Sequence, residues 1–259
     1  LTAVPAETEP AIRDRLLLFV AEAISSFLPG SLRTDVHDQV LATTIRLSRE
    51  TEDADAWRSY TRAFIAEFAA RGGDEYEATV RGFAASDNPD IAWRARRALA
   101  ARGLVDAGAV EAWRSADGSG EAARMSVEAL ASLPIEEARS HAWDSVYSET
   151  LSNDFLTATL AGLQASSWEG ETGIEAAVDR LRSYWESHTI GMALRYANGV
   201  LAYGLDIDRD GSVERSVGLL RSWLDTNGDA PAQLRRIVIE HLDAFERDER
   251  VQRRWKQDQ

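Results

Sequence analysis

The sequence predicts an all-α fold, an α-solenoid of about 13 helices stacked as antiparallel hairpins in a HEAT-like superhelix. Apolar residues recur three or four positions apart along almost the whole chain, which places them on one face of a helix. No stretch alternates apolar and polar residues over the length of a strand. The connections between periodic segments are short, so successive helices should lie antiparallel.

Six apolar stripes define most of the expected helices. In chain order they are Ile12, Leu16, Phe19, Ala23 and Phe27; Val36, Val40 and Leu47; Trp57, Tyr60, Phe64 and Phe68; Ile174, Val178, Leu181 and Trp185; Val213, Val217, Leu220 and Leu224; Leu234, Val238, His241 and Phe245. The fourth and fifth stripes share the spacing +4, +3, +4, and Val213 follows Ile174 by 39 residues. This offset resembles a two-helix repeat of the HEAT class, which runs to about 40–47 residues.

Capping residues mark the boundaries between these segments. Asn88 is expected to accept a free backbone N–H of a first turn, with Pro89 at the first helical position. Gly103 stands where a left-handed C-terminal cap is expected, and Pro134 and Pro231 mark two more helix starts. The short linkers are residues 103–106, 117–120 and 168–171. Because composition does not change along the chain, residues 1–259 are predicted to form a single helical-repeat domain.

Charge and cysteine content limit the classes of partner. The 29 basic and 43 acidic residues give a net charge of −14, which repels nucleic acids and anionic membrane surfaces. We therefore expect no nucleic-acid partner and no membrane partner. The chain has no cysteine, which excludes disulfides and thiolate metal sites and favours a cytoplasmic location. It begins with Leu1 and has no signal peptide, which indicates a fragment of a longer polypeptide.

An acidic segment resembles the start of a calcium-binding EF-hand loop. Asp206, Asp208 and Asp210 occupy positions 1, 3 and 5, and Gly211 occupies position 6. Position 12 is Val217, where the loop requires a bidentate Glu. Val217 also belongs to the apolar stripe of the next helix. We therefore predict no calcium site between Asp206 and Glu214, and interpret Asp210 as a helix cap.

The remaining candidates for chemistry are sparse, and we predict no catalytic, cofactor-binding or metal-binding residue in this chain. The histidines at 37, 141, 188 and 241 are far apart in sequence, and no His-Glu-x-x-His motif occurs. They are expected to be surface or packed residues. Among the tryptophans, Trp57 and Trp185 are expected in the core. Trp93 and Trp113 lie near helix ends and could be half exposed as part of a ligand groove, but packing between hairpins is the favoured interpretation.

Several segments between residues 85 and 245 resemble the aminopeptidase N family, in its actinobacterial form. They are residues 90–103 (DIAWRARRALAARG), 119–124 (SGEAAR), 135–146 (IEEARSHAWDSV), 149–153 (ETLSN) and 231–238 (PAQLRRIV). These matches are packing and capping positions. The family's His-Glu-x-x-His helix, its downstream Glu ligand and its Gly-Ala-Met-Glu-Asn loop do not occur here, so no catalytic residue is carried over.

The resemblance implies that this chain is the helical C-terminal domain of a zinc aminopeptidase. Its partners would then be the catalytic domain of the same polypeptide, which holds the zinc, and peptide substrates. It would wall off and gate the peptide chamber, and by itself would be neither an enzyme nor a zinc protein.

Two other classes remain open. A stand-alone α-solenoid scaffold would offer a concave surface to peptides or proteins, and the coding sequence upstream of Leu1 would distinguish it. A helix-turn-helix regulator needs a basic recognition helix. The most basic helix, 91–102, has no DNA-reading turn after it, and the charge of −14 opposes this reading.

Overall fold

The computed structural model describes residues 4–148, 151–166, 173–202 and 212–257, with the helical backbone alone for 212–214 and 256–257. In these ranges all regular structure is helical and no strand occurs, which confirms the all-α prediction. The same ranges hold fourteen α-helices, against about 13 expected. The apolar stripe from Ile174 to Trp185 spans two of them, because the helix is interrupted at Arg180, whose N–H bonds to the carbonyls of Ala176 and Val178.

The elements are short and closely spaced. The α-helices are α1 (Pro10–Glu22), α2 (Gly30–Glu50), α3 (Ala54–Arg71), α4 (Glu77–Ala84), α5 (Pro89–Ala101), α6 (Ala107–Ala116), α7 (Gly120–Ser132), α8 (Glu136–Val146), α9 (Asn153–Ala165), α10 (Ile174–Asp179), α11 (Leu181–Ser187), α12 (Ile190–Leu201), α13 (Ser212–Thr226) and α14 (Ala232–Gln257). Two 3₁₀ turns, η1 (Val4–Ala6) and η3 (Asp74–Tyr76), and one π-helical turn, η2 (Ala23–Phe27), complete the described structure.

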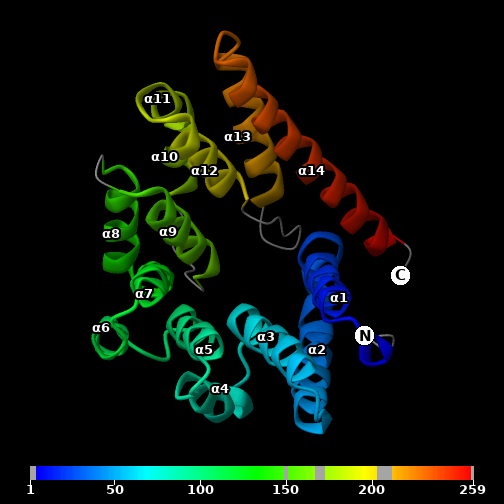
Figure 1. The fold of residues 1–259 in the computed structure, drawn as a ribbon. Coiled ribbons are helices and arrows are strands. Elements are labelled where there is room, and N and C mark those ends of the chain that lie inside the picture. Colours follow the sequence, from blue (N-terminus) through cyan, green and yellow to red (C-terminus); the bar gives the residue numbers. More distant parts are fainter. Residues whose placement is uncertain (1–3, 149–150, 167–172, 203–211, 258–259) are drawn as a thin grey trace.

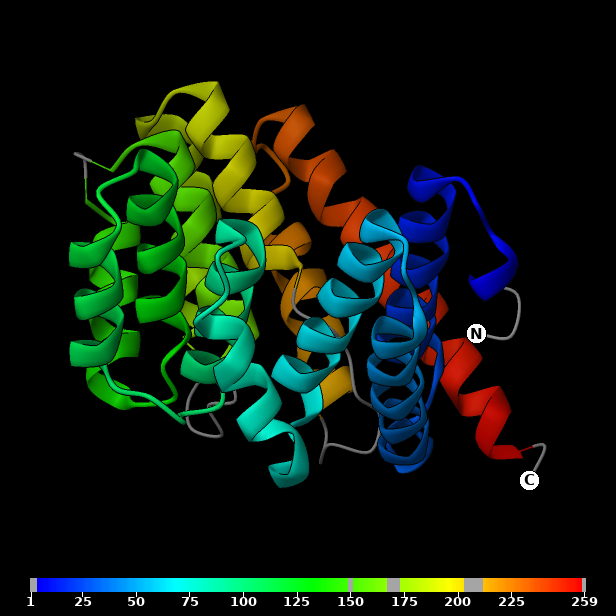
Figure 2. The same cartoon turned by 60° about the horizontal axis from the view of Figure 1, so that its bottom comes forward.

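The helices are arranged as hairpins around a ring (Figure 1). The paired helices are α2 with α3, α4 with α5, α6 with α7, α8 with α9, α10 and α11 with α12, and α13 with α14. Figure 2 shows the helices standing side by side in a curved wall, with the last part of α14 passing behind α1 and α2. The second helix of each pair packs against the second helix of the next, so that α3, α5, α7, α9, α12 and α14 contact one another in succession. We call these six the inner helices.

The ring is closed by its last helix. The C-terminal part of α14 returns to the start of the chain and contacts η2, beside α1 and α2 (Figure 1). The Gln252 side chain is fully buried there, and its Nε2 donates a hydrogen bond of 2.8 Å to the carbonyl oxygen of Ser26. Residues at opposite ends of the sequence are therefore neighbours, which is a long-range contact that helical periodicity does not reveal.

The predicted caps around α5 are confirmed. The Asn88 side chain accepts a hydrogen bond from the Ile91 N–H at 3.3 Å, and Pro89 opens the helix. At the other end Gly103 has a φ of 67°. The Leu104 N–H bonds to the carbonyl of Leu99 and the Gly103 N–H to that of Ala100, both at 2.9 Å. This pair of bonds is a Schellman motif, which requires a left-handed residue and so favours glycine.

One prediction of burial is wrong. Ile12 and Phe19 are 49% and 48% exposed, because α1 turns the opposite face, with Arg13 and Leu17, toward α3. Residues 16–19 are all apolar, so the sequence does not specify which side is buried. Trp93, by contrast, is only 2% exposed, which agrees with the favoured interpretation of packing between hairpins. Its indole packs on Ala122 and Met125 while its Nε1 donates to Asp117 at 2.9 Å.

Three other aromatic residues are intermediate in burial. Trp57 and Trp185, expected in the core, are partly buried at its edges, and Trp113 is partly buried as expected.

None of the described helices is both long enough and apolar enough to cross a lipid bilayer.

Candidate functional site

The inner helices share one way of beginning. Each of five has an N-cap side chain that accepts a backbone N–H three residues later, and these residues are Asp53, Asn88, Ser119, Ser152 and Thr189. Their positions are 31 to 37 residues apart. Because the inner helices stand side by side, these starts follow one another around the ring (Figure 1).

A carboxylate follows each of the first four caps by two residues. These acids are Asp55, Asp90, Glu121 and Asp154, each in the first turn of its helix. A carboxylate there interacts favourably with the free N–H groups of the helix N-terminus. In three of the four helices an arginine three or four residues later pairs with this acid: Arg58, Arg94 and Arg124. The result is a repeated ion pair at the start of successive inner helices.

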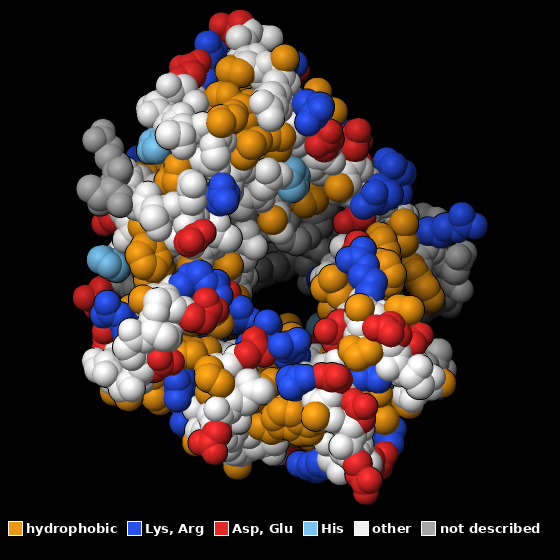
Figure 3. Space-filling view, viewed as in Figure 1, with side chains coloured by type: hydrophobic (Ala, Val, Ile, Leu, Met, Phe, Trp, Pro, Cys, Tyr) orange, Lys and Arg blue, Asp and Glu red, His pale blue; other side chains and the backbone are white. Residues whose placement is uncertain are grey.

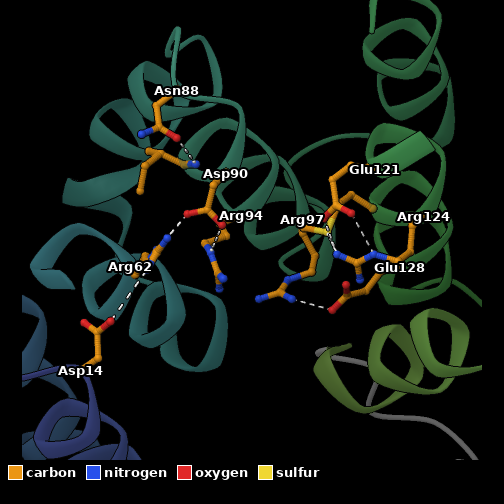
Figure 4. Close-up of polar contacts among 11 residues, drawn as sticks. Asp14, Arg62, Asn88, Asp90, Arg94, Arg97, Glu121, Arg124 and Glu128 are labelled. Atoms are coloured by element: carbon orange, nitrogen blue, oxygen red, sulfur yellow. Dashed lines mark hydrogen bonds and ion pairs between the residues drawn. The ribbon is translucent and has the colours of Figure 1, made fainter. Parts of the chain in front are cut away.

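Asp90 connects two inner helices, and its partner Arg62 lies close to α1. Its carboxylate accepts from Arg94 Nε in its own helix at 2.9 Å and from Arg62 Nε of α3 at 2.8 Å (Figure 4). The Arg62 guanidinium also lies 3.8 Å from Asp14 of α1. Partial burial raises the pKa of Asp90, but the hydrogen bonds from both guanidinium groups outweigh it and hold that pKa below its ordinary value. Asp90 is therefore a charged bridge between α3 and α5.

The next bridge lies between α5 and α7. Arg97 Nη1 lies 2.5 Å from Glu128 Oε1, and the Glu128 side chain is only 7% exposed. On α7, Arg124 pairs with Glu121, which lowers the pKa of Glu121 and raises that of Arg124 (Figure 4). Charged side chains thus connect α1, α3, α5 and α7 in succession.

The helices α3, α5 and α7, which carry most of these charges, border a central opening. Figure 3 shows acidic and basic side chains gathered at the edge of a central opening, over α3, α5 and α7. The bridging side chains are Asp14, Arg62, Asp90, Arg94, Arg97, Glu121, Arg124 and Glu128. They comprise four carboxylates and four guanidinium groups, so their formal charges cancel. We call this group the charged rim and take it as the candidate functional site.

The side chains of the charged rim can form hydrogen bonds and ion pairs with a ligand. Guanidinium and carboxylate groups bind the amides and termini of peptides through charge-assisted hydrogen bonds. Its eight side chains include no nucleophile paired with a base. Across the described ranges, no three His, Asp or Glu residues are grouped so as to hold a metal ion. The site is therefore suited to binding a polar chain.

The four histidines lie in four different environments. His37 Nδ1 pairs with Glu67, which is buried between α2 and α3. His141 is exposed at the edge of a groove between α7, α8 and α9. His188 stacks on Tyr184, with ring centres 3.8 Å apart. His241 Nε2 lies 3.4 Å from Asn198 Oδ1, and burial lowers its pKa. Each histidine is thus packed or at the surface.

The EF-hand-like segment lies outside the described residues, since residues 203–211 and the side chains of 212–214 are not among them. Position 12 of that motif is described. Val217 is 6% exposed and packs in the largest core cluster, as its apolar stripe predicts.

Sequence reasoning missed the charged rim. Its signal was present, as a capping residue, an acid two positions later and, in α3, α5 and α7, an arginine three or four positions further. The unequal spacing of 31 to 37 residues conceals it from a search for a fixed period. No family model and no curated protein matches this chain.

Proposed function

We propose that this chain is the non-catalytic C-terminal domain of a zinc aminopeptidase that removes N-terminal residues from peptides. It would wall off and gate the peptide chamber of the catalytic domain, which would carry the zinc and all of the chemistry. The observation that supports this is the ring of inner helices around an opening edged by ion pairs (Figures 1 and 3). The aminopeptidase N family, which the sequence resembles between residues 85 and 245, uses a helical bowl for this purpose.

We also propose that residues 1–259 form a single α-solenoid of HEAT-like hairpins. The regular pairing of helices and the five similar helix starts support it. Solenoids place one helix of each hairpin on a concave face, which is where such proteins bind extended chains. A cytoplasmic location is proposed because the chain has no cysteine.

The test uses the parent polypeptide with and without this domain. Turnover is measured on a single aminoacyl dye and on peptides of increasing length, together with the zinc content of each preparation. We expect removal of the domain to leave zinc unchanged and to alter the dependence of kcat/KM on peptide length. Stoichiometric zinc and chelator-sensitive turnover in the isolated chain would refute the assignment.

A point variant tests the charged rim itself. Arg94→Ala removes one guanidinium group of the rim, and Arg114→Ala removes an equivalent ion-paired one from the outer helix α6. Arg94→Ala should raise KM for long peptides while leaving the aminoacyl dye unaffected, and Arg114→Ala should change neither. A chain without an upstream His-Glu-x-x-His sequence would instead be the stand-alone scaffold, and direct peptide binding would be its readout.

A further inference from the structure

Two of the joints between successive inner helices are tightly packed. Between α7 and α9, a Cβ built on Gly162 would lie 2.3 Å from the carbonyl oxygen of Glu128. Between α9 and α12, one built on Gly199 would lie 2.6 Å from Leu160 Cδ1. Helix backbones that approach this closely leave no room for the helices to slide or tilt. These joints are therefore stiff.

The contact that closes the ring is built differently. We call it the seam, meaning the contact of the C-terminal part of α14 with α1, η2 and α2. Beside the buried Gln252 side chain it contains an open groove of about 770 Å³. The groove is lined by Val20, Ala23, Ile24, Phe27, Leu28, Val36, Gln39, Val40, Arg247, Val251 and Trp255. Trp255 remains 46% exposed.

An unfilled groove weakens the seam. Side chains that face a void lose the dispersion contacts that a filled core would give them. The same residues are stabilised less by burial, because water reaches part of their apolar surface. The element that α14 meets is η2, a π-helical turn, and such turns lack the regular bonding of an α-helix. The seam is thus the joint that separates most easily.

A charge at the seam acts in the same direction. The Asp248 side chain of α14 is only 13% exposed and lies beside the Ser26 hydroxyl of η2. Burial, with a smaller contribution from the carboxylate of Glu22 in α1, raises the pKa of Asp248 against the opposing effect of Arg247. No charged side chain of α2 lines the groove. At neutral pH the ionised Asp248 is better solvated when the seam is open, so its charge favours separation.

We propose that the ring opens at the seam, with α14 moving away from η2 and α2 while the tight joints between α7, α9 and α12 stay packed. Opening converts the ring into an arc and widens the central opening. Because the charged rim lies on α1, α3, α5 and α7, its distance from α14 changes when the seam parts. The proposal concerns this chain alone and does not depend on aminopeptidase function.

Distance measurement by pulsed electron paramagnetic resonance tests the proposal. The chain has no cysteine, so two introduced cysteines carry the only spin labels. Asp35→Cys in α2 and Asp243→Cys in α14 are at exposed positions, one on each of the two helices that the opening would separate. Ala78→Cys in α4 and Ala112→Cys in α6 form a control pair that does not cross it.

We expect the seam pair to give a short and a long distance at neutral pH and the control pair to give one. Gln252→Ala removes the hydrogen bond to Ser26 and should increase the long population. Asp248→Asn removes the buried charge and should decrease it, whereas Asp225→Asn on α13 should have no effect. A single distance at the seam that neither Gln252→Ala nor Asp248→Asn alters would overturn the proposal, as would an equal response of the control pair.

Discussion

The close approach of α7 and α9 makes Gly162→Ala a sharp test of the packing. Gly162 lies inside α9, where alanine would ordinarily be the better helix former. Here the added Cβ would meet the Glu128 carbonyl oxygen at 2.3 Å, the Ala131 Cβ at 2.7 Å and the Ser132 nitrogen at 3.1 Å. Two of these three atoms belong to the backbone of α7, so a rotamer change cannot relieve the collision.

The size of the effect follows from these distances. Real Cβ contacts almost never fall below 3.0 Å, so the two helices must separate by at least 3.0 − 2.3 = 0.7 Å. Overpacking of this kind costs about 1–3 kcal/mol, and here we take about 3 kcal/mol because backbone must move. The higher helix propensity of alanine adds about 1 kcal/mol to the free energy of unfolding. The net loss in the free energy of unfolding is about 2 kcal/mol, or about 4–8 °C in Tm for a chain of this size.

Gly218→Ala is the matched control. Gly218 lies within α13, and no atom lies within 4 Å of its added Cβ. The same substitution should therefore stabilise the protein, by about 0.5–1 kcal/mol. Urea unfolding followed by circular dichroism measures both variants. If Gly162→Ala were as stable as the wild type, or if both variants shifted in the same direction, the predicted close contact of α7 and α9 would be wrong.

Three further predictions concern polar groups. Arg97→Met should destabilise the protein by about 3 kcal/mol in urea unfolding, since it leaves the buried Glu128 carboxylate unpaired, and adding Glu128→Leu should recover much of the loss. Tyr184→Phe should raise Tm, because the buried Tyr184 hydroxyl has no hydrogen-bond partner among the described residues and its removal ends a desolvation penalty. Asp90→Asn should lower stability by at most about 1 kcal/mol, given the exposure of its ion pairs. Because the folded-state pKa of Asp90 is lowered, its contribution is present above the ordinary carboxyl value of 3.8 and is lost as pH falls through the lowered pKa.

Each of these has an outcome that contradicts it. Equal stability of the single and double variants at Arg97 and Glu128 would show that the carboxylate does not need its partner. A fall in Tm for Tyr184→Phe would mean that the hydroxyl is bonded after all. If the Asp90→Asn variant gave the same acid unfolding curve as the wild type, the two guanidinium groups would not be stabilising the ionised form of Asp90.

Local chemistry explains which parts of the fold were predictable. Asn88, Pro89 and Gly103 act within one turn of the backbone they cap, so their roles can be read from adjacent residues. The burial of Val217 could be predicted in the same way, because its stripe has a single apolar face.

Features that depend on distant partners were not predictable in this way. The face that α1 buries is decided by α3, through contacts such as that of Arg13 with the ring of Tyr60. Trp93 stands near the start of its helix, and its burial is decided by α7, which supplies Ala122 and Met125. The charged rim requires knowing that α3, α5 and α7 are neighbours, which periodicity within each helix does not reveal.

The contact between Gln252 and Ser26 also bears on how the chain folds. The two residues are 226 positions apart, and closing a loop of that length in an unfolded chain costs about 5 kcal/mol of entropy. The few polar contacts and the half-open groove of the seam offset only part of this cost. Neighbouring hairpins form contacts over much shorter separations, so the arc of helices assembles first and holds α14 near η2. The ring therefore closes last, and its closing contact is the first lost when the protein begins to unfold.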